Sequence, residues 1–201
     1  MLTIIDYQMG NQRSVINAFE AMGCEVCASN DPMEIVRADR IVLPGVGAFG
    51  EGMERLRKLG LIKILNEEVL HKKKPFLGIC LGMQLLADIG YEFGEHEGLG
   101  WISGKVKRIK ADGILLPHVG WNNLKLVNPS PILSSNLNGV DFYFVHSFHF
   151  ETSDPNHISA TCEYGEEFAA VVSKGNIFGA QFHPEKSQKA GRILLENFLK
   201  S

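Results

Sequence analysis

The first half of the sequence alternates short apolar runs with segments of helical periodicity, and this pattern limits the possible fold more than any other feature. The apolar runs span residues 2–6, 25–28, 40–43 and 76–79, and helical patterns lie between most of them. Strands that alternate with helices over short connections form parallel βαβ units with right-handed crossovers. The pattern therefore predicts a mostly parallel sheet with helices packed on it.

The expected helices follow from apolar residues spaced three or four positions apart. Residues 11–22 carry Val15, Phe19 and Met22 on one face, and the pattern stops at Gly23, a residue typical of helix ends. Further helices are expected over residues 52–58, 61–71, 80–89 and 187–199.

After Gly90 the sequence becomes rich in β patterns. A chain of 201 residues suffices for one well-cored domain. We find no repeat, low-complexity stretch or linker, so we expect a single domain over residues 1–201. Its predicted class is α/β, a three-layer sandwich with a mostly parallel central sheet and antiparallel β additions. The additional strands are expected over residues 104–109, 142–145, 158–162, 169–173 and 177–181.

The net charge of −3 gives no electrostatic reason to expect nucleic acid or an anionic membrane as a partner. The N-terminus lacks the basic and apolar regions of a signal peptide. No apolar run approaches the roughly 20 residues that a membrane span needs. We therefore expect a cytoplasmic protein.

The four cysteines do not form a pattern typical of disulfide frameworks in a chain of this size. Cys24 and Cys27 form a CxxC sequence, but it follows a helix, whereas a redox pair normally opens one. No second pair lies at zinc spacing. We interpret both as ordinary thiols and expect no metal and no cofactor.

The sequence Gly78-Ile79-Cys80-Leu81-Gly82 matches a nucleophile elbow with cysteine in place of serine. An expected strand precedes it and an expected helix follows, which is the context this motif requires. The flanking glycines relieve crowding in the sharp turn, and the N–H groups of the new helix favour a thiolate. Cys80 is therefore the candidate nucleophile.

His183 and Glu185 follow the last expected strand, in the sequence Phe182-His183-Pro184-Glu185. In an extended segment, residues two positions apart share a face, so the two side chains can project together. A carboxylate on one imidazole nitrogen fixes the tautomer and leaves the other nitrogen to take the thiol proton. His183 is the candidate base, Glu185 orients it, and the alternative bases near expected strands are His118, His146 and His149.

The segment Leu43-Pro44-Gly45-Val46-Gly47 follows another strand of the expected sheet. It is typical of the second oxyanion element of elbow enzymes, in which a loop N–H complements the N–H after the nucleophile. The predicted donors are the amides of Val46 and Leu81. A phosphate-binding loop is excluded, because neither G-K-[ST] nor GxGxxG is present.

Taken together, these motifs resemble the class I (triad) glutamine amidotransferases, and more narrowly the glutaminase subunits of imidazole glycerol phosphate synthases. The opening segment over residues 6–15 also fits, so the resemblance covers essentially the whole chain. Three departures are Gln8 and Gln12, where Gly and Leu are expected, and Phe148, where Tyr is frequent. The segments that carry the resemblance are PGVG (44–47), LGICLGMQ (77–84), PHVGWN (117–122) and QFHPEKS (181–187).

The resemblance implies that Cys80 attacks the side-chain amide of L-glutamine to give a glutamyl thioester and ammonia. His183 would move protons, and water would release glutamate. The head group of glutamine would be bound by Gln84 and Glu92, with the backbone at Gly47, Ser147 and Phe148.

The resemblance also implies a partner, a (βα)8-barrel synthase subunit that forms a heterodimer with this chain through Trp121, Asn122 and Lys186. The ammonia would react there with a phosphoribulosyl-formimino carboxamide ribotide in histidine biosynthesis. Imidazole glycerol phosphate and aminoimidazole carboxamide ribotide would be the products. One alternative is a paralogous glutaminase that supplies ammonia for sugar amidation in surface polysaccharides; another is a non-catalytic member of the same fold.

Overall fold

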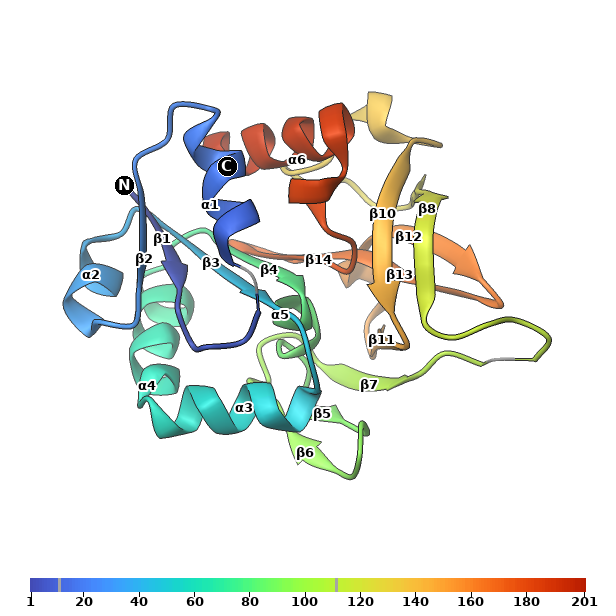
Figure 1. The fold of residues 1–201 in the computed structure, drawn as a ribbon, viewed down its shortest axis with the longest axis horizontal. Helices are drawn as coiled ribbons and strands as arrows, with labels where there is room; N and C mark the ends of the chain where they lie inside the picture. The colour runs from blue at the N-terminus through green and yellow to red at the C-terminus, as the bar shows by residue number, and fades with distance from the viewer. Residues whose placement is uncertain (11, 111) are drawn as a thin grey trace.

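A central sheet organises the part of the chain that the computed structural model describes, residues 1–10, 12–110 and 112–201 (Figure 1). The neighbouring strands at one side, from β2 to β14, pair in parallel, and the remaining three pair antiparallel. The order is β2 (Val26–Ser29), β1 (Leu2–Ile5), β3 (Arg40–Gly45), β4 (Phe76–Cys80), β14 (Ile177–Ala180), β13 (Glu166–Lys174), β12 (Ile158–Tyr164) and β9 (Lys125–Leu126).

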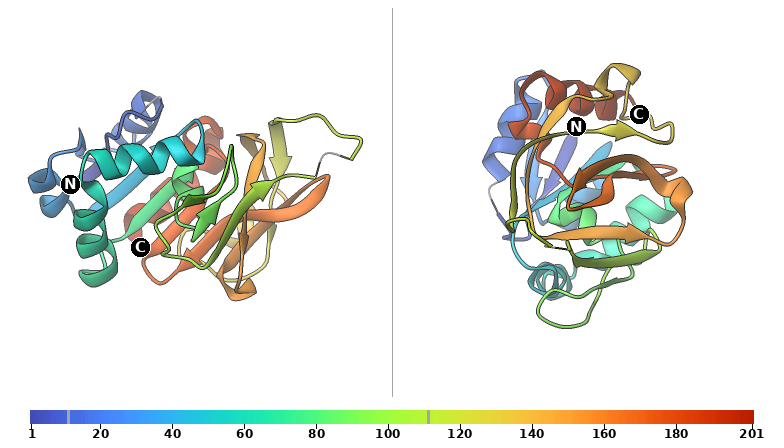
Figure 2. Two further views of the ribbon diagram at one scale, coloured as in Figure 1. Left: turned by 90° about the horizontal axis from the view of Figure 1, so that it is seen from below. Right: turned by 90° about the vertical axis from the view of Figure 1, so that its right-hand side faces the viewer.

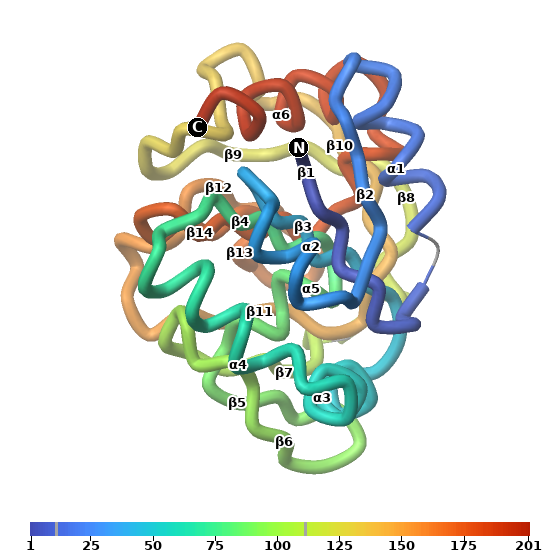
Figure 3. The backbone as a smooth tube through the Cα atoms, turned by 90° about the vertical axis from the view of Figure 1, so that its left-hand side faces the viewer, coloured from blue at the N-terminus to red at the C-terminus, as the bar shows by residue number. Residues whose placement is uncertain are grey.

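Helices cover both faces of this sheet, which confirms the predicted three-layer α/β class (Figures 2 and 3). One face carries α1 (Gln12–Glu20) and α6 (Gln188–Lys200). The other carries α2 (Pro32–Arg37), α3 (Phe49–Lys58) and α4 (Leu61–Leu65), which continues as a π-helical turn to His71. The expected first residue of α1, Asn11, lies outside the described residues.

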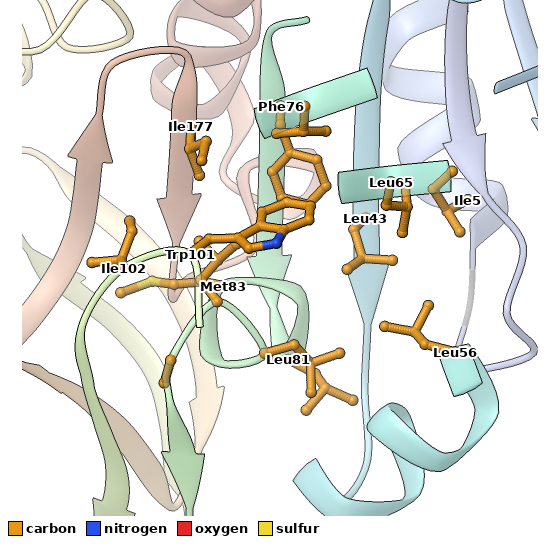
Figure 4. Packing of buried hydrophobic residues seen from close by; sticks show 14 of the residues in the cluster. Ile5, Leu43, Leu56, Leu65, Phe76, Leu81, Met83, Trp101, Ile102 and Ile177 are labelled. Atoms are coloured by element: carbon orange, nitrogen blue, oxygen red, sulfur yellow. The ribbon is translucent and has the colours of Figure 1, made fainter. Parts of the chain in front are cut away.

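Two hydrophobic cores form because successive residues of a strand point to opposite faces of the sheet. Ile4 and Val42 belong to the core beneath α1 and α6, whereas Ile5 and Leu43 belong to the core beneath α3 and α4. Figure 4 shows the second core, where Phe76 packs edge-on against Trp101 with ring centroids 4.9 Å apart. Each fully buried side chain of this size contributes about 1.5–3 kcal/mol.

Two smaller sheets complete the β-rich half. The expected strands over residues 104–109, 142–145, 158–162, 169–173 and 177–181 are confirmed as β7, β10, β12, β13 and β14. The sequence did not predict β8, whose glycine and asparagines have low strand propensity, nor β9, β11, β5 or β6. The smaller sheets pair β10 (Asp141–His146) with β8 (His118–Asn123), and β11 (Phe148–Thr152) with β7 (Gly104–Arg108), β5 (Ile89–Gly90) and β6 (His96–Glu97).

The expected helix over residues 80–89 is wrong, because α5 spans only Leu81–Gln84. The carbonyl oxygens of Leu85 and Leu86 accept hydrogen bonds from the amides of residues 99, 101 and 102, so they do not continue the helix. Asp88 then binds the Gly104 amide at 2.9 Å and ties the segment to β7. Tertiary hydrogen bonds thus override the helical pattern.

The helix α2 was missed although the sequence carries its start signal. The Asp31 side chain accepts a hydrogen bond from the Met33 amide at 2.8 Å, and Pro32 occupies the first helical position. Aspartate before proline is typical of a helix start. The segment is short, which hides its periodicity.

Candidate active site

Cys80 is the last residue of β4 and stands at the sharp turn into α5. Its backbone angles are φ 54° and ψ −109°, a conformation that non-glycine residues rarely adopt. The helix α5 has a single turn, so it has little macrodipole. It stabilises negative charge on the sulfur through the N–H groups of its first residues. The strained turn holds the thiol at the end of the strand, as the elbow motif predicts.

Two glycines make this turn possible by allowing close backbone approach. A Cβ atom at Gly82 would overlap the carbonyl oxygen of Leu43, and one at Gly78 would overlap the carbonyl oxygen of Gly82. The turn therefore packs directly on its own backbone and on the neighbouring strand β3. Neither position has room for a side chain.

His183 reaches Cys80 because β14 is the parallel neighbour of β4, with Ala180 opposite Ile79. The carboxyl ends of the two strands therefore meet at one edge of the sheet, and the imidazole and the thiol line the same cavity. Burial lowers the pKa of His183. The hydrogen bonds and charges of Cys80 and Glu185 outweigh burial and raise that pKa to about 9. The imidazolium form is thus favoured at neutral pH.

Glu185 binds the other imidazole nitrogen, with its Oε1 2.9 Å from Nδ1 of His183. The side chains are 3% and 5% exposed, so solvent screens this pair little. The contact arises differently from the sequence expectation, because Pro184–Lys186 forms a 3₁₀ turn and the segment is not extended. Ser187 fixes the turn by donating to the carbonyl oxygen of His183 at 2.6 Å.

A Glu185→Gln substitution is expected to lower the pH at which glutaminase activity declines on the alkaline side. His183 must be protonated to give a proton to the leaving ammonia, and its raised pKa keeps it protonated up to about pH 9. Removal of the carboxylate charge lowers that pKa, so the alkaline limb moves down. The measurement is kcat/KM for glutamine between pH 6 and 10, in steps fine enough to resolve a shift of about one pH unit. An alkaline limb that does not move would contradict the assignment of His183 and Glu185.

The stability of the folded chain depends on the same group with a defined sign. The folded-state pKa of His183 is raised to about 9 from an ordinary 6.5. The corresponding stabilisation is fully present below pH 6.5 and is lost as pH rises through about 9.

The thiol opens into a cavity of about 210 Å³ that gathers most of the predicted site residues. Val145 and His146 also line it, although the sequence did not assign them to the substrate site. Their position follows from the pairing of β10 with β8, a strand that the sequence did not predict. The predicted residues in the cavity wall are Val46, Gly47, Cys80, Leu81, Gln84, Glu92, Ser147, Phe148, His183 and Lys186.

Gln84 and Glu92 are fixed by hydrogen bonds at the cavity wall. Nε2 of Gln84 donates to the carbonyl oxygen of Phe148 at 2.9 Å and to Oε1 of Gln181 at 3.0 Å. Glu92 accepts from the amide of Phe49 at 2.9 Å, at the start of α3. Both amide hydrogens of Gln84 are therefore occupied, and its carbonyl oxygen is the atom that can accept from a ligand.

The oxyanion segment lies beside Cys80, because Gly45 at the end of β3 is opposite Cys80 in register. Val46 is 45% exposed and Gly47 has φ 112°, so the segment turns out of the sheet into the cavity wall. A Cβ at Gly45 would overlap the Tyr7 hydroxyl, and one at Gly10 would crowd Val46. The opening segment of the chain therefore supports this loop.

The alternative bases have partners other than the thiol, although His146 lines the same cavity. Burial lowers the pKa of His118 to about 4 and that of His146 to about 3, so both rings are neutral. His149 is followed two residues later by Glu151, but that carboxylate pairs with Lys105 and Lys107. Its own ring lies 3.4 Å from Glu166, and His183 alone of these four histidines pairs with Glu185 in the described part of the chain.

Of the predicted interface residues, Trp121 and Lys186 both lie against Tyr143, and Lys186 also lines the cavity. Trp121 is 48% exposed and packs edge-on against Tyr143, with ring centroids 5.9 Å apart. Nζ of Lys186 lies 6.0 Å from the centre of the same ring. Asn122, the next residue of β8, points to the opposite face of the strand, is half-buried and donates to the carbonyl oxygen of Glu163 at 2.9 Å. Exposed aromatic surface next to the cavity is typical of a protein interface.

The remaining sequence expectations concern metals, thiols and membranes. In residues 1–10, 12–110 and 112–201, no group of three or more His, Cys, Asp or Glu side chains could hold a metal ion. Cys24 and Cys27 are free thiols. Across the same residues, no helix has the length and apolar character needed to cross a membrane.

Comparison with known proteins agrees with this geometry. The sequence model of a family described as glutamine amidotransferase class-I matches residues 3–201. A protein of Campylobacter jejuni strain RM1221, imidazole glycerol phosphate synthase subunit HisH 1, is 47% identical over 201 residues, which is 100% of both chains. Subunit HisH 2 of Pseudomonas aeruginosa is 44% identical over 99% of this chain and 98% of its own.

Solved structures show the same fold at lower identity. A crystal structure of a glutamine amidotransferase superposes with a TM-score of 0.78 at 19% identity, covering 99% of this chain and 97% of the other. The structure of PurLQS from Thermotoga maritima gives a TM-score of 0.76 at 19% identity, covering 99% and 97%.

Proposed function

This chain belongs to the class I glutamine amidotransferase family, and we propose that it is the glutaminase subunit of an imidazole glycerol phosphate synthase. The observation that carries the proposal is that Cys80 and His183 line one cavity while Glu185 binds the His183 ring at 2.9 Å. The relatives bearing that name match along the whole chain.

The first half of the reaction forms a thioester. Sγ of Cys80 attacks the side-chain carbonyl carbon of glutamine, and the resulting oxyanion accepts from the amides of Val46 and Leu81. His183, as the imidazolium, gives its proton to the amide nitrogen, and the carbon–nitrogen bond breaks to release ammonia. The short contact with Glu185 keeps the imidazole in the required tautomer.

The second half hydrolyses the thioester. Neutral His183 takes a proton from a water molecule as the water oxygen attacks the thioester carbon. The carbon–sulfur bond then breaks, glutamate leaves and the imidazolium is restored. Gln84 and Glu92 hold the substrate ammonium group in both halves, since both line the cavity and both have side-chain oxygens that can accept from it. Backbone groups at Gly47, Ser147 and Phe148 hold the carboxylate end.

The second subunit in this proposal is a (βα)8-barrel synthase that binds over Trp121, Asn122 and Lys186. Val119 and Trp121 are 56% and 48% exposed and lie two positions apart on β8, so they share one face. Lys186 lines the cavity and also lies over the Tyr143 ring, which contacts Trp121. Ammonia that leaves the cavity past Lys186 would therefore enter the synthase subunit. The complex would act in the cytoplasm.

A paralogous role in sugar amidation is the second candidate. The relatives from Campylobacter jejuni and Pseudomonas aeruginosa are numbered HisH 1 and HisH 2. This numbering distinguishes more than one such subunit and favours testing the acceptor separately from the glutaminase chemistry.

Growth of a histidine auxotroph tests the acceptor. A strain that lacks its own glutaminase subunit is expected to grow without histidine, at low ammonium, when it expresses this chain with the barrel subunit from the same genome. Cys80→Ala in the same plasmid is the matched control and should not support growth. Failure to grow, with a complex that hydrolyses glutamine in vitro, would overturn the histidine assignment and favour the sugar acceptor.

A further inference from the structure

A pair of buried histidines lies between the interface strand β8 and the glutamine cavity. His118 opens β8 and is 3% exposed; His146 ends β10 and is 6% exposed. The two residues are opposite each other in the β10–β8 register, and Nδ1 of His118 lies 3.0 Å from Nε2 of His146. The proposed triad uses neither ring.

The hydrogen bonds around this pair allow only one arrangement of protons. Nδ1 of His146 lies 2.9 Å from the carbonyl oxygen of Phe148, which can only accept, so that nitrogen carries the hydrogen. Nε2 of the same neutral ring must then accept, and Nδ1 of His118 must donate to it. Nε2 of His118 accepts in turn from Nδ2 of Asn122 at 3.4 Å. Both rings therefore hold their hydrogen on Nδ1.

Burial supports the neutral state of both rings. It lowers the pKa of His118 to about 4 and that of His146 to about 3. The nearby rings of His183 and His149 lower the pKa of His146 further, because a positive charge on either one disfavours a second charge. His118 is enclosed by Tyr164, stacked at 4.0 Å between ring centroids, and by Phe144 at 4.9 Å.

The Phe148 carbonyl joins this pair to the substrate site. The same oxygen accepts from Nε2 of Gln84 at 2.9 Å, and Gln84 also donates to Gln181. Gln181 in turn donates from Nε2 toward the Cys80 sulfur at 3.8 Å. The direction of the Phe148 carbonyl therefore decides which way the Gln84 amide faces, and the Gln84 carbonyl oxygen is the atom left for the substrate.

We propose that His118 and His146 are positioning residues for glutamine binding: as neutral Nδ1–H tautomers they fix the Phe148 carbonyl and thereby orient the Gln84 amide toward the substrate. The inference rests on the glutaminase function proposed above. Both rings act on Gln84 through the Phe148 carbonyl, and His118 lies outside the cavity lining, so their loss should weaken substrate binding more than the chemical step.

Substitutions that keep or remove the Nδ1 donor test this role. His146→Leu and His118→Leu, assayed with the barrel partner, are each expected to raise KM for glutamine roughly 10-fold while kcat changes less than about 3-fold. The side-chain nitrogen of asparagine can stand where Nδ1 stands, so His146→Asn and His118→Asn should restore KM to within about 3-fold of the parent chain. His118 does not line the cavity, whereas His146 does. An effect of His118→Leu on KM therefore reports positioning and not direct contact with the substrate.

The tautomers can be observed without activity. Long-range ¹H–¹⁵N correlation spectra of the full-length chain should show the hydrogen on Nδ1 of both rings near neutral pH. A hydrogen on Nε2 of His146, or an unchanged KM in a folded His146→Leu chain, would overturn the inference. So would a fall in kcat alone that asparagine does not rescue. Absence of turnover in the parent complex would instead count against the proposed function.

Discussion

Replacing Cys80 by alanine is expected to abolish glutaminase activity, by at least roughly 10³-fold in kcat, while the chain stays folded. The reaction needs a sulfur that can form and break a bond with the glutamine carbonyl carbon, and alanine has none. Alanine can occupy the φ 54° turn with a strain similar to that of cysteine, so the elbow should persist. The measurement is glutamate release by the complex with the barrel subunit, beside an unfolding curve.

Cys162→Ala is the matched control for that substitution. Cys162 is a second buried cysteine, 2% exposed, and burial raises the pKa of its thiol to about 12, so it remains a thiol at neutral pH. Its replacement should cost some stability from the lost packing but leave glutamine turnover within about 2-fold. Turnover by Cys80→Ala above about a tenth of the parent rate would require a different nucleophile.

Gly82→Ala is expected to have the largest effect on the fold around the site. The new Cβ would overlap the carbonyl oxygen of Leu43, an atom of the buried strand β3 that cannot move without disturbing the sheet. We expect a loss of more than about 4 kcal/mol in the free energy of unfolding. Since domains are stable by only about 5–15 kcal/mol, activity should fall with it. Urea unfolding of the purified chain measures the effect.

Gly52→Ala is the control for the glycine substitution. Gly52 is buried in α3, and a Cβ there would meet side-chain atoms of Leu81 and Leu85 at 3.2–3.4 Å, which can shift. Alanine is also the better helix former. A change within about 1 kcal/mol is therefore expected. If Gly82→Ala were as stable as Gly52→Ala, the close packing of the elbow on β3 would be wrong.

Strong local signals explain which parts of the fold the sequence predicted. The parallel strands are buried on both faces, so β1, β3 and β4 read as continuous apolar runs, and α6 shows a clear apolar face. The strands β8 and β11 were missed. In β8, Gly120 and the asparagines weaken the strand pattern, and its partner β10 comes more than ten residues later in the sequence. The end of α5 was missed because hydrogen bonds from residues 99–102 decide it.

In the active site, too, the sequence predicted the residues that belong to local motifs and missed the contacts between distant segments. Cys80, His183 and the loop at Val46 lie at or directly after expected strands and carry recognisable motifs, so the sequence predicted them as site residues. The support beneath them could not: Tyr7 under Gly45 and His146 above Phe148 depend on side-chain packing between distant segments. Such contacts leave no periodic pattern in the sequence. The Glu185 contact was predicted, but through an extended segment, whereas a 3₁₀ turn makes it.

Covalent labelling tests the central claim most directly. The complex with the barrel subunit would be treated with a glutamine analogue that carries an electrophilic carbon in place of the side-chain amide, and the modified peptide located by mass spectrometry. One adduct is expected, on Cys80, and it should form more slowly when glutamine is present and much more slowly in His183→Ala. Labelling at Cys24, Cys27 or Cys162 instead, or labelling of Cys80 that glutamine does not slow, would contradict it.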